Sequence, residues 1–195
     1  MKAWLKLLRP HQWVKSGFVF VGLLFGHAWH DAAVVQQVLL AAVAFSLAAS
    51  AVYVGNDIVD RERDRQHPDK RRRPLASGAI TPARAMAVGV GCMLAAAGIA
   101  WLASPVAAAI IAAYLLLNVG YTLGLKHIVL LDVFIISAGF MLRILAGTLG
   151  VGIAPSHWLL LCGFMVTLFL GFAKRRAELK ALDGLSLNIQ QGELF

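Results

Sequence analysis

Residues 34–64 read VVQQVLLAAVAFSLAASAVYVGNDIVDRERD, an apolar stretch that ends in a run of closely spaced acids. The apolar part is about as long as the ~20 residues that a helix needs to span a membrane. The acidic run from Asn56 to Asp64 therefore lies where such a helix leaves the membrane, and Arg71, Arg72 and Arg73 follow soon afterwards. Carboxylates and guanidinium groups at a membrane mouth indicate a metal-bound phosphate site.

The rest of the chain has the composition of a membrane protein. Hydrophobic residues make up 59% and charged residues 14% of its 195 residues, against roughly 45–50% apolar residues in a soluble domain. The apolar residues fall into blocks of spanning length, which predicts an all-α, polytopic transmembrane helical bundle. We expect about six spans, at residues 14–29, 34–55, 84–103, 105–123, 129–149 and 157–173.

The positive charges support this topology. Lys and Arg collect in the cytoplasmic connections of membrane proteins, and 17 of the 18 basic residues fall on one side of the six predicted spans. Trp29, Trp101 and Trp158 fall at the opposite interface, where aromatic rings anchor in the lipid head groups. We therefore expect an integral membrane protein, in a bacterial inner membrane, with both termini and the acidic run in the cytoplasm. The basic face needs no nucleic acid to explain it, and no recognition motif accompanies it.

The spacing of the acids favours a metal site. In a continuous helix Asp57, Asp60 and Asp64 share one stripe, and Asn56 lies four residues before Asp60. Carboxylates at these spacings repel one another unless a cation lies between them. Oxygen ligands of this kind suit Mg²⁺, which uses one or two protein carboxylates and completes its shell with water and substrate phosphate. The alternative is local neutralisation by the interleaved arginines Arg61, Arg63 and Arg65.

Several segments together resemble the UbiA superfamily of intramembrane prenyltransferases. Asn56-Asp57-x-x-Asp60-x-x-x-Asp64 fits the NDxxDxxxD signature, and Arg73-Pro74-Leu75-Ala76-Ser77-Gly78 is similar to the RPLxSG segment that follows it. The opening residues 8–15 resemble the branch that contains polyprenyl-phosphate phosphoribosyltransferases. Further similar segments extend through the chain in the expected order: Tyr121-x-x-x-Leu125-Lys126, Asp132, Gly139-Phe140, Arg143 and Lys174-Arg175-Arg176-x-Glu178-Leu179.

This resemblance implies a helical bundle around a central cavity, with acidic sites that bind diphosphate through Mg²⁺ on the cytoplasmic side. The family has nine spanning helices, so residues 1–195 are expected to form a single UbiA-like transmembrane domain that lacks the three C-terminal helices. Catalytic roles are implied for Asp57, Asp60 and Asp64. The implied metal ligands are Asn56, Asp57, Asp60, Asp64 and Glu178. The implied substrate-binding residues are Lys15, Arg73, Lys126, Arg143, Lys174, Arg175 and Arg176.

One departure from the family pattern bears on the substrate. Many members have a second DxxxD after the sixth helix, whereas this chain has Lys174, Arg175, Arg176 and Glu178 there. A basic pocket favours several phosphates, so we expect transfer of 5-phosphoribose from phosphoribosyl diphosphate to a polyprenyl phosphate, with release of diphosphate. The alternative within the family is transfer from a prenyl diphosphate to an aromatic acceptor. Outside it, a membrane transporter and a non-catalytic truncated bundle, completed by an oligomer or another partner, both stay open.

Two charged residues of the fifth predicted span have two interpretations each. Asp132 either orients Lys126 or a substrate, or is a solvated acid at a helix N-terminus. Arg143 lies deeper, where a cation is costly and faces the bundle interior. It either contacts substrate or binds backbone carbonyls. Cys92 and Cys162 lie within predicted spans without metal-ligand spacing, and we expect them to pack in the core.

Overall fold

The computed structural model describes residues 2–125 and 128–192, with side chains given except those of residues 129–130, 174–175 and 177–192. Every regular element in the described part is helical. In chain order they are α1 (Lys2–Leu8), η1 (Pro10–Phe20), α2 (Val21–Phe25), η2 (Ala28–His30), α3 (Ala32–Val59), α4 (Arg61–Gln66), η3 (Lys70–Arg72), α5 (Pro82–Ala103), α6 (Pro105–Leu123), α7 (Val129–Ala146), η5 (Leu149–Val151) and α8 (His157–Gly192).

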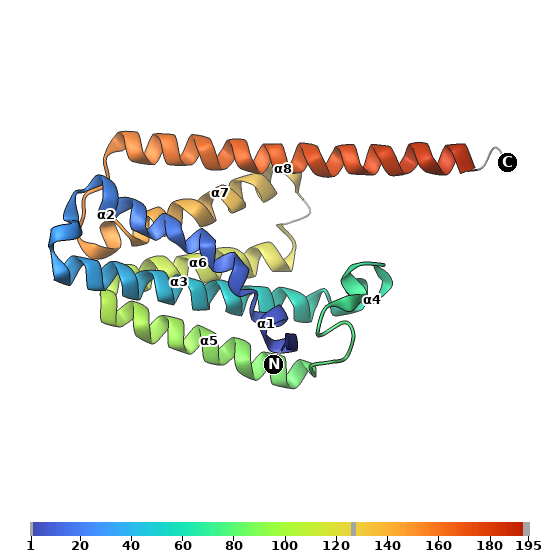
Figure 1. The fold of residues 1–195 in the computed structure, drawn as a ribbon, viewed down its shortest axis with the longest axis horizontal. Helices are drawn as coiled ribbons and strands as arrows, with labels where there is room; N and C mark the ends of the chain where they lie inside the picture. Colours follow the sequence, from blue (N-terminus) through green and yellow to red (C-terminus); the bar gives the residue numbers. More distant parts are fainter. Residues whose placement is uncertain (1, 126–127, 193–195) are drawn as a thin grey trace.

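The long helices lie side by side as a bundle, and α8 extends beyond one end of it (Figure 1). Helix α3 runs through the middle and packs most extensively against α5. Alanines make this close contact, with Ala41, Ala44 and Ala48 of α3 and Ala96 and Ala100 of α5 fully buried. Small residues let membrane helices approach closely, which is where their packing energy comes from.

Local signals in the sequence fix the helix boundaries. Asp31 caps α3 by accepting hydrogen bonds from the backbone N–H groups of Ala33 and Val34, at 2.9 and 3.2 Å. Ser104 caps α6 in the same way through Ala107 N, at 2.9 Å. Pro82 and Pro105 occupy first helical positions, where the missing N–H costs nothing.

Four of the six predicted spans are confirmed as helices long and apolar enough to cross a membrane: Ala32–Val59, Pro82–Ala103, Pro105–Leu123 and Leu131–Val151. The sixth is the shorter apolar part of α8, His157–Ala173. Large apolar side chains on α5 and α6 point outward, such as Leu102 at 74% and Leu123 at 79% exposure. This arrangement suits a lipid-facing surface.

The prediction of a regular α-helix over residues 14–29 is wrong. That part of the chain is a 3₁₀ helix, η1, followed by the single turn of α2. It packs against α3 and α7, and its backbone approaches α7 so closely that a Cβ on Gly147 would overlap the carbonyl of Val19. A 3₁₀ helix rises about 2.0 Å per residue, so η1 and α2 together still reach about 30 Å, the thickness of a hydrocarbon core.

The ends of α3 and α6, the start of α7 and the short helix α4 all gather at one end of the bundle, and α2 lies at the other (Figure 1). The acidic run therefore lies at the end that the basic connections share. This is the arrangement that the charge distribution predicts.

Candidate active site

The acidic run does not form one continuous helix. Helix α3 ends at Val59, Asp60 leaves helical geometry with ψ near 2°, and α4 begins at Arg61. Asp57 lies in the last turn of α3 and Asp64 in α4, and both are buried. The break bends the predicted stripe, so the spacing along the sequence no longer decides which neighbours each polar side chain meets.

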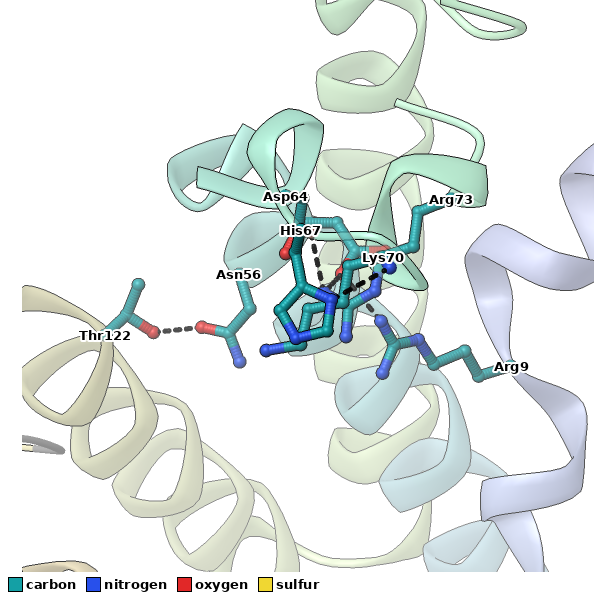
Figure 2. Close-up of polar contacts among 8 residues, drawn as sticks. Arg9, Asn56, Asp64, His67, Lys70, Arg73 and Thr122 are labelled. Atoms are coloured by element: carbon teal, nitrogen blue, oxygen red, sulfur yellow. Dashed lines mark hydrogen bonds and ion pairs between the residues drawn. The ribbon is translucent and has the colours of Figure 1, made fainter. Parts of the chain in front are cut away.

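One arginine, Arg73, lies between the two buried carboxylates of Asp57 and Asp64, and Figure 2 shows Arg73 and Arg9 near Asp64. Arg73 Nη1 donates to Asp64 Oδ2 at 2.7 Å and to Asp57 Oδ1 at 3.2 Å. Arg9 Nη2 donates to the same Asp57 oxygen at 2.6 Å. We call these four residues the arginine–aspartate network. It ties Arg9, at the start of η1, to α3 and α4 around Asp57, whose side chain is 2% exposed.

The predicted alternative, neutralisation by the arginines of the acidic run itself, is not what the structure shows for Asp57 and Asp64. Arg65 instead donates to both carboxylate oxygens of Glu62, at 3.1 Å, and to the carbonyl of Ala76. Arg61 lies 3.8 Å from Glu62. The cations that reach Asp57 and Asp64 come from further away in the sequence.

A basic cavity of about 560 Å³ adjoins the network. Arg9, Arg73 and Asp57 line it together with Lys6, His11 and Arg72. Asp57 Oδ2 is buried, and none of the described side chains or backbone groups donates to it. An acceptor in that position is satisfied only by a further donor or a cation.

Asn56 faces the opposite side of α3 (Figure 2). Its side chain contacts the Thr122 hydroxyl on α6 and lines a second, central cavity of about 350 Å³. Lys15 and Arg143 line the same cavity. The structure thus brings together three of the predicted site residues, from η1, α3 and α7.

Arg143 is held at the deep end of this cavity by polar and aromatic contacts. Its Nη1 donates to Gly139 O at 2.7 Å and its Nη2 to Tyr114 OH at 3.3 Å. The guanidinium carbon lies 4.9 to 5.7 Å from the ring centroids of Phe45, Tyr114 and Phe140. The contact with a backbone carbonyl is present in the structure. Arg143 also lies in the cavity wall, and its contact with substrate stays a prediction.

The remaining predicted residues are placed as follows. Asp60 is half-buried at the break between α3 and α4, and Arg176 is exposed on α8. Lys126 lies outside the described residues, as do the side chains of Lys174, Arg175 and Glu178. The roles predicted for these residues stay predictions.

Sequence reasoning missed several residues of the two cavities. Arg9 belongs to the opening segment, residues 8–15, that resembles the family, but no site role was predicted for it, although it pairs with Asp57. Tyr53, Tyr114 and Asn118 line the central cavity, and polar groups within apolar spans were the signal that could have identified them.

Asp132 is buried and accepts from Tyr121 OH at 2.9 Å, so it is not a solvated acid.

The residues fit a magnesium ion held partly by its substrate. Among the described residues no three acidic, histidine or cysteine side chains converge as a complete cage, and Arg73 already holds one oxygen of Asp57 and one of Asp64. Mg²⁺ is ordinarily bound by one or two carboxylates together with substrate phosphates. The cavity-facing Asn56, the half-buried Asp60 and the second carboxylate oxygen of Asp64 supply oxygens of the right chemistry.

Comparison with known proteins agrees with this arrangement. The model of the UbiA prenyltransferase family matches residues 16–183. A decaprenyl-phosphate phosphoribosyltransferase from Corynebacterium glutamicum is 39% identical over 181 residues, which cover 90% of this chain and 54% of the relative. Its counterpart from Mycobacterium tuberculosis is 38% identical over 178 residues, 89% of this chain and 59% of the relative. The chain thus spans a little over half the length of these relatives.

The fold has a solved counterpart. A structure of a UbiA homologue from Archaeoglobus fulgidus, bound to GPP and Mg²⁺, superposes with a TM-score of 0.72. The alignment covers 85% of this chain and 60% of the homologue, at 20% sequence identity. At that identity the likeness shows the fold alone: a membrane helical bundle.

Proposed function

The chain belongs to the UbiA prenyltransferase family, and from that premise we propose that it carries the catalytic site of a magnesium-dependent intramembrane transferase. The proposed donor is phosphoribosyl diphosphate and the proposed acceptor is a polyprenyl phosphate. The names of the two bacterial relatives support this choice. So does the excess of cations around both cavities.

The observation that carries the proposal is the make-up of the central cavity. Lys15, Asn56 and Arg143 line one space. The lining of this cavity runs along α7 from Ile135 to Arg143, which is about 12 Å of that helix. A cavity of this length with separate cations suits a substrate that carries phosphate groups at two positions. Its volume of about 350 Å³ lies at the low end for drug-sized ligands, so a polyprenyl chain must extend out of it into the lipid.

The proposed reaction is a displacement at C1 of the ribose. An oxygen of the lipid phosphate forms the new bond to C1 while the bond from C1 to the diphosphate oxygen breaks, and diphosphate leaves with the electron pair. Lys15 and Arg143 hold phosphate oxygens and thereby align the reacting atoms. No covalent intermediate on the protein is needed.

Asn56, Asp60 and the second carboxylate oxygen of Asp64 are the proposed ligands of the metal, and Asp57 holds Arg9 and Arg73 beside them. When bound, Mg²⁺ neutralises charge on the diphosphate leaving group. Arg73 lies where it can pass from the carboxylates to a phosphate, because its side chain is 31% exposed. The proposed site faces the cytoplasm of a bacterial inner membrane, because the basic connections lie at the same end of the bundle.

A diphosphate-release assay on the detergent-solubilised chain tests the proposal. Polyprenyl phosphate with phosphoribosyl diphosphate should release diphosphate in the presence of Mg²⁺, and prenyl diphosphate with an aromatic acid should not. The reverse result would support the aromatic prenyltransferase. Solute flux in liposomes without release of diphosphate would support the transporter.

The same assay on Asp60→Ala tests the metal ligands. We expect release to fall by a factor of about 10³, since several kcal/mol of charge stabilisation depend on the bound metal. Unchanged release by this variant would remove Asp60 from the site.

A further inference from the structure

The hydroxyl group of Thr122 contacts two acceptors at once as the side chains are placed. Thr122 Oγ1 lies 2.8 Å from the carbonyl oxygen of Asn118, one turn earlier in α6, and it also contacts Oδ1 of Asn56 on α3. A threonine hydroxyl has one proton and two lone pairs. It can donate to only one of these two oxygens.

The two partners differ in what they can do. The Asn118 carbonyl can only accept, and a threonine within a helix commonly donates to the carbonyl four residues earlier. The Asn56 amide can either accept through Oδ1 or donate through Nδ2, and hydrogen-bond partners decide which end points where. Both contacts are hydrogen bonds only if Thr122 donates to Asn118 and accepts from Asn56 Nδ2.

We infer that Thr122 is a positioning residue. It turns the side-chain amide oxygen of Asn56 into the central cavity, where this oxygen is available to a hard divalent cation. Thr122 itself does not line that cavity. It lines a separate apolar groove between α3, α5 and α6, so it acts on the cavity through Asn56 (Figure 2).

The orientation matters because the two ends of the amide differ as ligands. An amide oxygen binds Mg²⁺ and similar cations, whereas an amide N–H group repels them. The backbone N–H of Asp60 still donates to the backbone carbonyl of Asn56 at 2.9 Å. Asp60 therefore lies one turn beyond Asn56 on the same face of α3, and the amide oxygen points to the side that carries the next proposed ligand. This inference rests on the proposed function for the identity of the cation.

The test measures binding of Mn²⁺ alone to the full purified chain in detergent, by electron paramagnetic resonance. Thr122→Val keeps the shape of the side chain but removes both the donor and the acceptor. Loss of an outer-shell partner costs about 10- to 100-fold in metal affinity, and we expect Mn²⁺ binding to weaken by that factor. Thr122→Ser keeps the hydroxyl and should bind Mn²⁺ within about 3-fold of the wild type, less than the outer-shell loss.

A second variant separates orientation from structural damage. Asn56→Asp has oxygen at both ends of the side chain, so its ligand atom does not depend on Thr122. Adding Thr122→Val to Asn56→Asp should therefore leave Mn²⁺ affinity unchanged. If Thr122→Val caused the same loss in the Asn56→Asp background as in the wild type, or no loss in the wild type, the inference would be overturned.

Thr167→Val is the matched control. Thr167 is buried and, like Thr122, donates to a carbonyl of its own helix, here Phe164 O at 3.0 Å on α8. The Thr167→Val protein should bind Mn²⁺ as the wild type does. A loss of Mn²⁺ affinity in this variant would show that any missing threonine hydroxyl disturbs the site.

These measurements distinguish the inference from the proposed function. Binding of Mn²⁺ that depends on Thr122, without transfer of phosphoribose, would refute the transferase and keep the inference. Mg²⁺-dependent transfer of phosphoribose, together with Mn²⁺ binding that does not depend on Thr122, would support the transferase and refute the inference. A wild-type chain that binds no Mn²⁺ would overturn the inference alone, because in the proposed reaction the substrate phosphates supply part of the metal shell and the diphosphate-release assay decides the function.

Discussion

Asn56 and Asp57 are neighbours in the sequence but belong to two different environments. Asn56 faces the central cavity with Lys15 and Arg143, whereas Asp57 is buried in the arginine–aspartate network on the other side of α3. Successive residues of a helix point about 100° apart, so a polar run at a helix end divides between two surroundings. One side faces the central cavity, and the other holds the ends of the helices together.

The largest expected effect comes from a substitution in the arginine–aspartate network. Asp57→Asn removes the carboxylate that Arg9 and Arg73 share, and loss of one partner from a buried ion pair costs roughly 3–5 kcal/mol. Both arginines keep some access to water, with 21% and 31% of their side chains exposed. We therefore expect a loss of stability near the lower limit, about 3 kcal/mol, measured by thermal unfolding in detergent.

Asp69→Asn is the control for this experiment. Asp69 is exposed at the rim of the same basic cavity, and exposed substitutions usually stay within about 0.5 kcal/mol. Equal stability of the two variants would show that Asp57 does not hold the network together.

The next largest effect should appear on the cavity side. Arg143→Met replaces a buried cation by an apolar side chain of similar length, a change that often leaves stability unaffected. If Arg143 binds a substrate phosphate, the loss of a hydrogen bond between charged groups should raise KM for phosphoribosyl diphosphate by about 10- to 100-fold. Thermal unfolding and steady-state kinetics on the same preparation separate the two effects.

The opposite pattern is also informative. A less stable Arg143→Met protein with unchanged KM would assign Arg143 to the structure alone, through Gly139 O and Tyr114 OH. Arg143 would then stabilise the fold, as Asp57 does, and would not bind substrate in the cavity that Asn56 faces.

The division between the two sides could be predicted from the sequence only in part. The spans and the shared basic end follow from hydrocarbon thickness and charge distribution, because these depend on composition along the chain. The partners of Asp57 do not: Arg9 lies 48 residues away, and the break at Asp60 changes the direction of the carboxylates that follow it. The 3₁₀ helix η1 could not be predicted either, since the close approach of Val19 and Gly147 is a tertiary contact.

The smallest expected effect concerns the charges of the acidic run that belong neither to the central cavity nor to the arginine–aspartate network. Glu62 is 70% exposed and pairs with Arg65 at 3.1 Å, and exposed ion pairs of this kind contribute about 0–1 kcal/mol. Glu62→Gln should therefore lower the free energy of unfolding by less than about 0.5 kcal/mol at low ionic strength. Added salt should remove even this difference, because it screens exposed charges. A loss as large as that of Asp57→Asn would mean that the run is neutralised by its own arginines, and that Arg9 and Arg73 are not the cations on which the end of α3 depends.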